Sequence, residues 1–383
     1  MIPYGKQEIT DSDIMAIKDV LQSDFLTQGP AVPKFEKNIS RYVGSNYAVA
    51  TNSATSALHI ACLSLGLTKG DILWTSPNSF VASSNCALYC GATVDFVDIS
   101  LDTYNICIDA LEEKLIQSKK NNSLPKVLIP VHLCGQSCDM KRIKLLSEEY
   151  GFMIIEDASH AIGGKYKDLP IGNCKYSDIC IFSFHPVKII TTGEGGIATT
   201  NDRHLAEKLE LYRSHGITRD RNIMQKDLGP WYYEQLVLGF NYRMTDIQAA
   251  LGYSQLLRIE TIIKKRHQVA ERYFKLLDKL PLVLPRQSSD SYSSFHLFVI
   301  RLKLDEINQT HLQVFESMQK KGIGVNLHYI PIHMHPFYES FGFKEGDFPN
   351  AEKYASEAIS IPIFPQLVEE LQDEVISALI SSI

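Results

Sequence analysis

Three consecutive segments decide the fold: VLIPVHL (127–133), MKRIKLLSEEY (140–150) and FMIIED (152–157). The first and third are short apolar runs, which predict buried strands, and the second has a helical pattern. A strand, a helix and a second strand in this order form the unit of a parallel sheet. The same alternation extends outward to YAVAT (47–51) and GIATT (196–200). The sequence therefore predicts an α/β fold, with a mostly parallel sheet covered by helices on both faces.

The pattern changes in the last third of the chain. Residues 244–280 form one long helical stretch, and the strand-like SFHLFVIRL (294–302) follows it. A chain of this length usually divides its core. We therefore expect a large domain over residues 1–255 and a smaller C-terminal α/β domain over residues 256–383, with the long helix as the bridge between them.

The composition is that of an ordinary globular protein, since 45% of the 383 residues are hydrophobic and 21% are charged. This balance excludes a disordered or collagen-like chain. The formal net charge is −6, from 38 Lys and Arg against 44 Asp and Glu. A mildly acidic chain argues against nucleic acid or an anionic membrane as the main partner, because both require clustered positive charge.

The sequence carries no visible targeting signal. Its first ten residues, MIPYGKQEIT, lack the pattern of a secretory signal, and no stretch approaches the roughly 20 apolar residues of a membrane span. The eight cysteines are scattered through apolar segments rather than spaced as a disulfide framework. We expect them to be reduced and the protein to be cytoplasmic, without a membrane partner.

Two groups of residues have the chemistry of metal ligands. They are His132, Cys134 and Cys138 in VHLCGQSCD, and His328, His333 and His335 in HYIPIHMH. Neither group has the paired CxxC or HxxxH spacing of a known zinc site. We expect no metal, and interpret the first group as a strand that enters a Gly loop and the second as a Pro-rich loop facing substrate or solvent.

Two predicted strand ends carry side chains with complementary chemistry. At NSATSALHIA (52–61), small residues separate a strand from a helix, so backbone N–H groups could bind a phosphate, although Ser and Thr are also typical helix caps. At EDASH (156–160), Asp157 could cap a helix, bind a metal or pair with a cationic ring nitrogen. His160 could lie over the same ligand or be an ordinary buried histidine.

A third strand end, SFHPVKIITTGEGGIATT (183–200), carries Lys188 between an apolar strand and a Gly-rich turn. Apolar surroundings disfavour the ammonium form, which makes an amine nucleophilic enough for a Schiff base. A surface lysine is the alternative, but it explains the flanking glycines poorly. A phosphate cradle, an Asp for a ring nitrogen and a Schiff-base Lys are together what a pyridoxal 5'-phosphate (PLP) site requires. Phe80, at another strand end, could stack on the ring or belong to the core.

Five motifs, in this order and at these separations, resemble the DegT/DnrJ/EryC1/StrS family of PLP-dependent sugar-nucleotide aminotransferases. They are NSATSAL, SPNSFVAS, EDASHA, SFHPVKIITTGEGG and GFNYRMTDIQAALG. The resemblance runs from PYGKQEI to the HYIPIH loop and so covers nearly the whole chain. It implies PLP fold type I, the aspartate aminotransferase fold, with a mostly parallel seven-stranded sheet in the large domain and a smaller C-terminal α/β domain.

The resemblance implies three roles around the cofactor ring. Lys188 would be the catalytic residue that forms the Schiff base, and Asp157 would pair with the pyridine nitrogen. His160 would contact the ring or its hydroxyl, from a position where many relatives have Gln. These assignments depend on matching positions in the family motifs.

The resemblance also implies how the phosphate and the substrate bind. Ala54, Thr55 and Ser183 would hold the phosphate, and Asn241 would reach the phosphate of the partner subunit, because relatives form homodimers with shared active sites. The segments expected to line the sugar-nucleotide pocket contain Tyr4, Leu26, Thr27, Asn326, His328 and Tyr329.

Within the family, the resemblance is strongest to members that serve the pseudaminic acid route. It is carried by Ala54 in NSATSAL, where most members have Gly, and by the SFH, YRSHG and VNLHYIPI segments. This likeness implies a UDP-linked 4-keto-6-deoxy N-acetyl sugar as acceptor and L-glutamate as amino donor. Amination of another UDP- or dTDP-linked 4-keto or 3-keto sugar stays open as an alternative.

Other activities of this fold would require different residues at these positions or lack some of these motifs. The resemblance implies that a sugar dehydratase of this family would have His in place of Lys188. A non-catalytic regulator would be expected to have lost Lys188 or Asp157, and the chain retains both. Lyases and desulfurases of fold type I lack the GFNYRMTDIQAALG and LTQGP segments.

Overall fold

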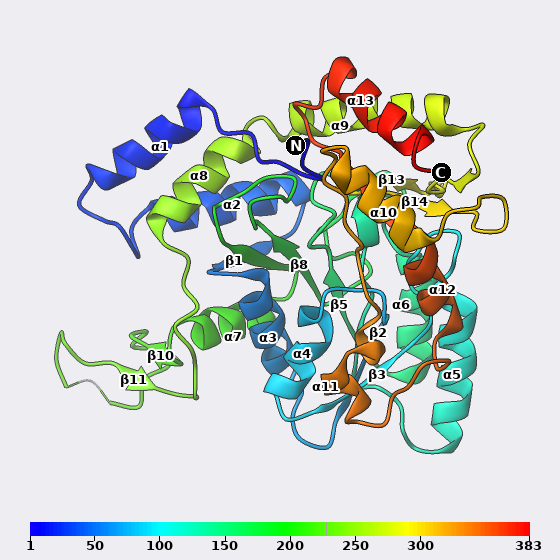
Figure 1. Ribbon diagram of the computed structural model, residues 1–383. Helices are drawn as coiled ribbons and strands as arrows, with labels where there is room; N and C mark the ends of the chain where they lie inside the picture. The colour runs from blue at the N-terminus through cyan, green and yellow to red at the C-terminus, as the bar shows by residue number, and fades with distance from the viewer. Residues whose placement is uncertain (227) are drawn as a thin grey trace.

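The computed structural model describes residues 1–226 and 228–383. Its centre is a seven-stranded sheet with the order β1-β9-β8-β5-β4-β2-β3 (Figure 1). The strands are β1 (Tyr47–Thr51), β2 (Ile72–Thr75), β3 (Thr93–Phe96), β4 (Val127–Ile129), β5 (Met153–Asp157), β8 (Ile179–Ser183) and β9 (Gly196–Thr200). Strand β9 is antiparallel to both of its neighbours, and the other pairs are parallel. The prediction of a mostly parallel seven-stranded sheet is confirmed.

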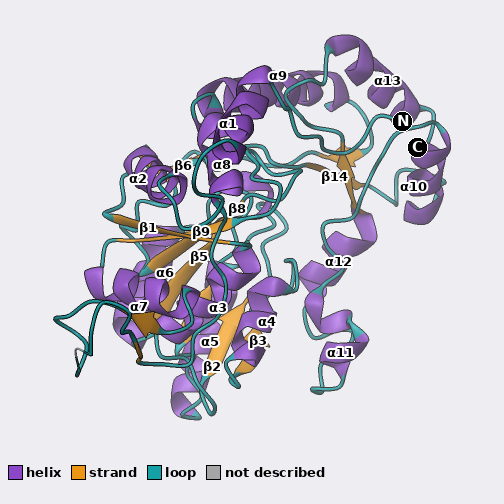
Figure 2. Ribbon diagram, turned by 90° about the vertical axis from the view of Figure 1, so that its left-hand side faces the viewer, coloured by secondary structure: helices purple, strands orange, loops and turns teal. Residues whose placement is uncertain are grey.

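Helices cover both faces of this sheet (Figure 2). They are α2 (Ala31–Val43), α3 (Ala54–Ser64), α4 (Ala82–Tyr89), α5 (Ile108–Lys120), α6 (Met140–Tyr150), α7 (Arg203–Arg213) and α8 (Asp246–Leu256). Because successive strand residues point to opposite faces, Ile155 and Ile181 pack in one core with α3, α4 and α7. Ile154 packs with α5 and α6, and Phe182 packs with α2 and α8. The strands are therefore buried on both sides, as their continuous apolar runs predict.

Local sequence signals set where these helices begin and end. The side chain of Asp139 accepts a hydrogen bond from the N–H of Arg142 and so caps the start of α6. The helix ends at Gly151, whose φ of 81° lies in the left-handed region that favours glycine. Short caps of this kind hold the crossover helices in place and so fix the loops at the ends of the strands.

A second, three-stranded antiparallel sheet has the order β12-β14-β15. Its strands are β12 (Leu282–Val283), β14 (Phe298–Leu302) and β15 (Ala358–Ile361), packed with α9 (Ile259–Leu277), α10 (His311–Lys320) and α13 (Glu369–Ile380). The first turns of α9 bury Ile259 and Ile263 in the core of the large sheet, whereas Tyr273 and Leu277 belong to the core of the small sheet. Helix α9 thus joins the two cores, and the domain boundary at residue 255 stays a prediction.

The remaining elements lie at the periphery. They are α1 (Asp11–Leu21), β6 (Lys165–Tyr166), β7 (Leu169–Pro170), β10 (Ile217–Thr218), β11 (Glu234–Gln235), β13 (Ser291–Tyr292), α11 (Pro336–Glu339) and α12 (Pro349–Glu357), with short 3-10 turns at Leu133–Gly135 and Ile332–Met334. Strands β10 and β11 form an arm that projects from the body of the molecule (Figure 1). Within the described part of the chain, no helix is both long and apolar enough to cross a membrane.

Candidate active site

A pocket of about 680 Å³ opens at the carboxyl ends of the strands in the large sheet. Its walls include residues that directly follow β1, β2, β4, β5 and β8, together with the first turn of α3. This is the edge where ligands bind in open α/β sheets. Tyr4, from the N-terminal segment, and residues 326–329 also line the pocket.

The first turn of α3 forms one end of the pocket. Ser53 caps the helix by accepting a hydrogen bond from the N–H of Ser56. The N–H groups of Ala54 and Thr55 donate to no described residue. Strand β9 runs so close to this turn that a Cβ on Gly196 would lie 2.4 Å from the nitrogen of Ala54. Two free N–H groups at the start of a helix, closely approached by Gly196, fit the predicted phosphate cradle.

Asp157 lies at the end of β5 and is 5% exposed. Its Oδ2 accepts a hydrogen bond of 2.6 Å from the hydroxyl of Ser83, and its Oδ1 accepts one of 3.1 Å from the N–H of Ser159. The element that follows β5 is strand β6 and not a helix, so Asp157 does not cap a helix. A buried carboxylate, fixed by two donors and lining the pocket, fits the role of partner to a cationic ring nitrogen.

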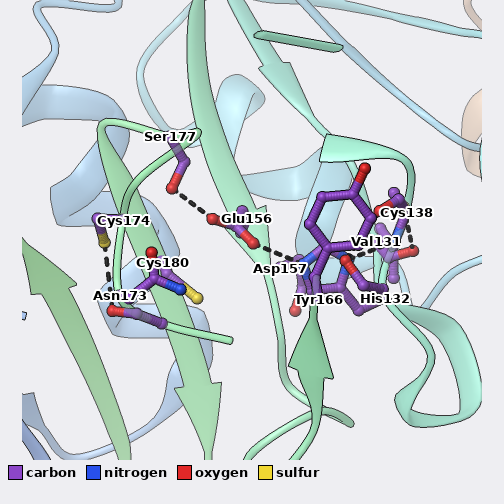
Figure 3. Close-up of polar contacts among 12 residues, drawn as sticks. Val131, His132, Cys138, Glu156, Asp157, Tyr166, Asn173, Cys174, Ser177 and Cys180 are labelled. Atoms are coloured by element: carbon purple, nitrogen blue, oxygen red, sulfur yellow. Dashed lines mark hydrogen bonds and ion pairs between the residues drawn. The ribbon is translucent and has the colours of Figure 1, made fainter. Parts of the chain in front are cut away.

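Glu156, the neighbour of Asp157, points to the other face of β5 (Figure 3). Its carboxylate bonds His132 Nε2 at 2.7 Å and accepts a hydrogen bond of 2.5 Å from Ser177. The N–H of His132 in turn donates to the carbonyl of Asp157 at 3.0 Å. His132 thus joins β5 to the end of β4: its Nε2 bonds Glu156, and its Nδ1 accepts a hydrogen bond of 3.1 Å from the backbone N–H of Cys138.

Lys188 lies in the loop after β8, where its N–H donates to the carbonyl of His185 at 3.0 Å. The side chain is partly exposed, and it lines the pocket. Burial lowers the pKa of its amine to about 8, although the charge of Asp157 opposes this shift. None of the described residues forms a hydrogen bond or ion pair with Nζ. A lysine of this kind is a nucleophile candidate rather than a solvated surface residue.

Two of the predicted site residues, His160 and His328, contact other protein groups through both of their ring nitrogens. His160 accepts a hydrogen bond from the N–H of Cys134 at Nδ1 and lies 3.2 Å from the hydroxyl of Tyr329 at Nε2. His328 bonds Ser360 through Nδ1 and Asn326 through Nε2. Burial, followed by the charge of Lys188, holds the pKa of His160 well below its usual value and lowers that of His328 to about 3. Both imidazoles are therefore neutral at pH 7.

Most of the predicted site residues meet in this pocket. They are Tyr4, Ala54, Thr55, Phe80, Asp157, His160, Ser183, Lys188, Asn326, His328 and Tyr329. Phe80 is 58% exposed, so it is not a core residue, and its ring centroid lies 6.1 Å from that of Tyr329.

Three predicted residues lie outside the pocket of the single chain. Leu26 and Thr27 are exposed and pair with the start of α8, through a bridge from Thr27 to Thr245 and a bond from the N–H of Asp246 to the carbonyl of Leu26. Asn241 is exposed on the neighbouring segment. These residues follow helix α1 or precede helix α8, far along the chain from the strand ends, and do not contribute to the pocket within one chain.

Some pocket residues were not singled out from the sequence. Ser83 follows Phe80 by three positions, and its helical spacing was the available signal. His296 lines the pocket from the segment before β14. No local pattern in SFHLFVIRL distinguishes it from a core residue of a strand.

Four of the six residues with the chemistry of metal ligands, His132, Cys138, His328 and His333, bond other groups of the protein through their side chains. His333 bonds Glu352 at 2.8 Å, in addition to the pairs formed by His132 and His328. Among the residues that the structure describes, no three His, Cys, Asp or Glu side chains are grouped as metal ligands would be. All eight cysteines are free thiols.

The chain was compared with known proteins. The model of the DegT/DnrJ/EryC1/StrS aminotransferase family matches residues 7–380. The UDP-4-amino-4,6-dideoxy-N-acetyl-beta-L-altrosamine transaminase of Campylobacter jejuni is 38% identical over 368 residues, which cover 96% of this chain and 93% of the relative.

Solved structures support the same family assignment. PseC of Helicobacter pylori, an aminotransferase of pseudaminic acid biosynthesis, superimposes with a TM-score of 0.90 at 31% identity, covering 100% of this chain and 98% of its own. Spr1654 of Streptococcus pneumoniae, assigned as a sugar aminotransferase and solved in its PLP form, gives a TM-score of 0.88 at 27% identity, covering 100% and 98%. The chain therefore belongs to the DegT/DnrJ/EryC1/StrS aminotransferase family and is a PLP-dependent aminotransferase.

Proposed function

We propose that this aminotransferase transfers the amino group of L-glutamate to the 4-keto carbon of a UDP-linked 6-deoxy N-acetyl hexosulose, as a step of pseudaminic acid biosynthesis. The likeness to the altrosamine transaminase and to PseC over nearly the whole chain supports the proposal. The pocket supports it as well, because aromatic and amide residues of the 326–329 segment line the same pocket as Lys188.

The residues around the pocket fit PLP. The free N–H groups of Ala54 and Thr55, with the hydroxyl of Ser183, would hold the phosphate, and Asp157 would face the ring nitrogen. Lys188 would bind the aldehyde. When bound, PLP supplies an electron-withdrawing ring that stabilises negative charge on the carbon whose proton is removed.

The chain's own residues position and move protons in this proposal. Burial lowers the pKa of Lys188 to about 8, close enough to physiological pH for its amine to accept and return a proton. Asp157, fixed by Ser83 and Ser159, would favour a proton on the ring nitrogen through its negative charge. His160, neutral and held by Cys134 and Tyr329, would contact the ring without adding a competing positive charge.

The sugar side of the pocket would be formed by Tyr4, Asn326, His328 and Tyr329. His328 and Tyr4 have ring centroids 5.1 Å apart, and both lie beside the segment that carries Tyr329. The hydroxyl, amide and imidazole groups here can hydrogen-bond the hydroxyl and acetamido groups of a sugar. Loops of this kind carry specificity.

We further propose that the active enzyme is a homodimer with shared sites, located in the cytoplasm. In such a dimer, Asn241 would reach the phosphate of the partner's cofactor, and Leu26 and Thr27 would line the partner's sugar pocket. The segments that flank these residues expose Phe25, Trp231, Leu236 and Leu238 on the single chain, at 52%, 73%, 39% and 78%. These exposed apolar side chains are available to be buried in a subunit interface.

The observation that carries the proposal is the placement of Lys188 and Asp157 in one pocket with the 326–329 segment. The test is to incubate the purified protein with L-glutamate and a panel of UDP- and dTDP-linked 4-keto and 3-keto sugars, and to detect aminated products by mass. The proposal expects amination of the UDP-linked 4-keto-6-deoxy N-acetyl sugar with the highest kcat/KM. Preferred amination of a dTDP-linked or 3-keto sugar would contradict the proposal and assign that sugar as the substrate instead.

A further inference from the structure

His296 has ring nitrogens without a hydrogen-bond partner, in a residue that is 4% exposed. Its Nδ1 is buried and bonds no described residue, and Nε2 forms no hydrogen bond to one either. Because Nε2 is not among the buried atoms and the residue lines the pocket, this nitrogen faces the pocket interior. A buried polar group without a partner is costly, so it calls for an explanation.

The protein holds this imidazole rigidly. Its backbone N–H donates to the carbonyl of Cys134 at 2.9 Å, and the guanidinium of Arg266 donates to its carbonyl at 3.2 Å. Its ring packs on the ring of His160, with centroids 4.4 Å apart. A side chain fixed at backbone and ring, with one nitrogen directed into a pocket, is preorganised for a ligand.

The pocket offers few other positions for an anion besides the phosphate. Of the four histidines that line the pocket, His160 and His328 use both of their nitrogens within the protein, His185 is exposed to solvent, and His296 is buried and uses neither nitrogen. Among the described residues that line the pocket there is no arginine, and Lys188 is reserved for the reaction. Every amino acid donor brings at least one carboxylate, which must be bound close to the reacting lysine.

Burial, reinforced by the charge of Lys188, holds the pKa of His296 well below its usual value. The ring is therefore neutral in the free pocket and carries one N–H. We assign that N–H to Nε2, because an unpartnered N–H at the buried Nδ1 would be the rarer and costlier arrangement.

We propose that His296 is a specificity-determining residue whose Nε2–H binds a carboxylate of the amino donor. The inference rests on the proposed function, in which L-glutamate is the donor. It adds a contact for the donor half of the reaction, and it predicts that the sugar half does not depend on His296.

The test compares His296→Phe and His296→Gln with the parent PLP-loaded enzyme. Phe keeps the ring packing on His160 but has no N–H, whereas the Gln amide places an N–H at a similar reach. His204→Phe, at an exposed position of α7, is the matched control. Glutarate, which carries the carboxylates of glutamate without its amine, serves as the probe in isothermal titration calorimetry, so that binding is read without turnover.

We expect His296→Phe to bind glutarate about ten- to a hundredfold more weakly, the loss typical of a hydrogen bond to a charged group. His296→Gln should recover most of the affinity, and His204→Phe should bind like the parent. The rate of single-turnover formation of 2-oxoglutarate from L-glutamate should follow the same order, with His296→Phe the slowest and His296→Gln close to the parent. The dissociation constant of PLP and the thermal midpoint should stay within error for a folded variant.

Parent-like glutarate binding by His296→Phe would overturn the inference. Weakened PLP binding, or slowing confined to the sugar half-reaction of enzyme loaded with pyridoxamine phosphate, would also overturn it, because His296 would then serve the cofactor or the sugar. If only the proposed sugar is wrong, the glutarate result is unchanged, and the parent and the variants alike fail to aminate that sugar. A parent enzyme that neither binds glutarate nor converts L-glutamate overturns the donor assignment and the inference together.

Discussion

The hydroxyl of Ser83 lies 2.6 Å from Oδ2 of Asp157 and donates a hydrogen bond to it. Ser83 belongs to α4 and Asp157 to the end of β5, so this bond fixes the carboxylate from a helix that packs on the sheet. The second oxygen is held by the N–H of Ser159. The charge is thereby aimed into the pocket instead of being free to rotate.

Asp157→Asn should keep the fold and some cofactor but lower kcat by about one to three orders of magnitude. An opposite charge shifts the pKa of its partner by about 1–3 units, and the neutral amide removes that effect on the ring nitrogen. Steady-state kinetics with PLP in excess would measure the loss. Transamination at the parental rate would mean that the Asp157 charge has no part in the reaction.

Ser83→Ala should lower kcat less, by about tenfold, since the charge remains and one hydrogen bond to it is lost. Ser84→Ala is the control, because Ser84 lies on the same helix as Ser83 but its hydroxyl bonds Tyr338 of α11 instead of Asp157. Its kcat should stay parental even if its thermal midpoint falls. Equal kcat losses in the two variants would assign the effect to α4 packing and not to Asp157.

Gly196→Ala should weaken PLP binding by at least about tenfold. The added Cβ would lie 2.4 Å from the nitrogen of Ala54, so β9 or the first turn of α3 must shift, at a typical cost of about 1–3 kcal/mol. Gly5→Ala is the control, since its nearest neighbour lies at an ordinary 3.6 Å. Pyridoxal, which lacks the phosphate, should lose much less affinity than PLP; an equal loss for both would argue against a phosphate cradle at this turn.

His132→Ala should lower the free energy of unfolding by about 3–5 kcal/mol, because it leaves the buried carboxylate of Glu156 without its main partner. Urea unfolding would measure the change. In a double-mutant cycle with Glu156→Gln, the two effects should be strongly non-additive. Additive losses would mean that the two side chains stabilise the protein independently.

Co-refolding tests the shared site. Lys188→Ala and Asn241→Asp should each be inactive, but a 1:1 mixture unfolded and refolded together should regain about a quarter of the parental activity. Half of the dimers would be mixed, and each mixed dimer would have one site with both lesions and one with neither. No recovery, despite mixed dimers verified by mass, would mean that Asn241 does not act on the partner's site.

The sequence predicted the sheet and most of the pocket because both depend on local patterns. Apolar runs define buried strands, and the carboxyl ends of parallel strands meet at one edge, so Ala54, Asp157 and Lys188 could be brought together without coordinates. The residue next to Asp157 was missed, although the alternation of side chains along a strand already places Glu156 on the opposite face.

Other residues carried no local signal. His296 reaches the pocket because Cys134 and Arg266 hold its backbone, a relationship between distant segments that periodicity does not contain. Leu26, Thr27 and Asn241 lie outside the pocket of one chain. Their predicted roles depend on a second subunit, which a pattern within one sequence describes only through family resemblance.

The most direct test of the account is the covalent attachment of the cofactor to Lys188. The purified protein should be yellow, and borohydride reduction followed by peptide mass mapping should place the cofactor on Lys188. In the cofactor-free protein, the rate of PLP attachment should rise as the pH passes the Lys188 pKa of about 8, because the neutral amine is the nucleophile. Reduced cofactor on another lysine, or parental turnover by Lys188→Ala, would contradict the account.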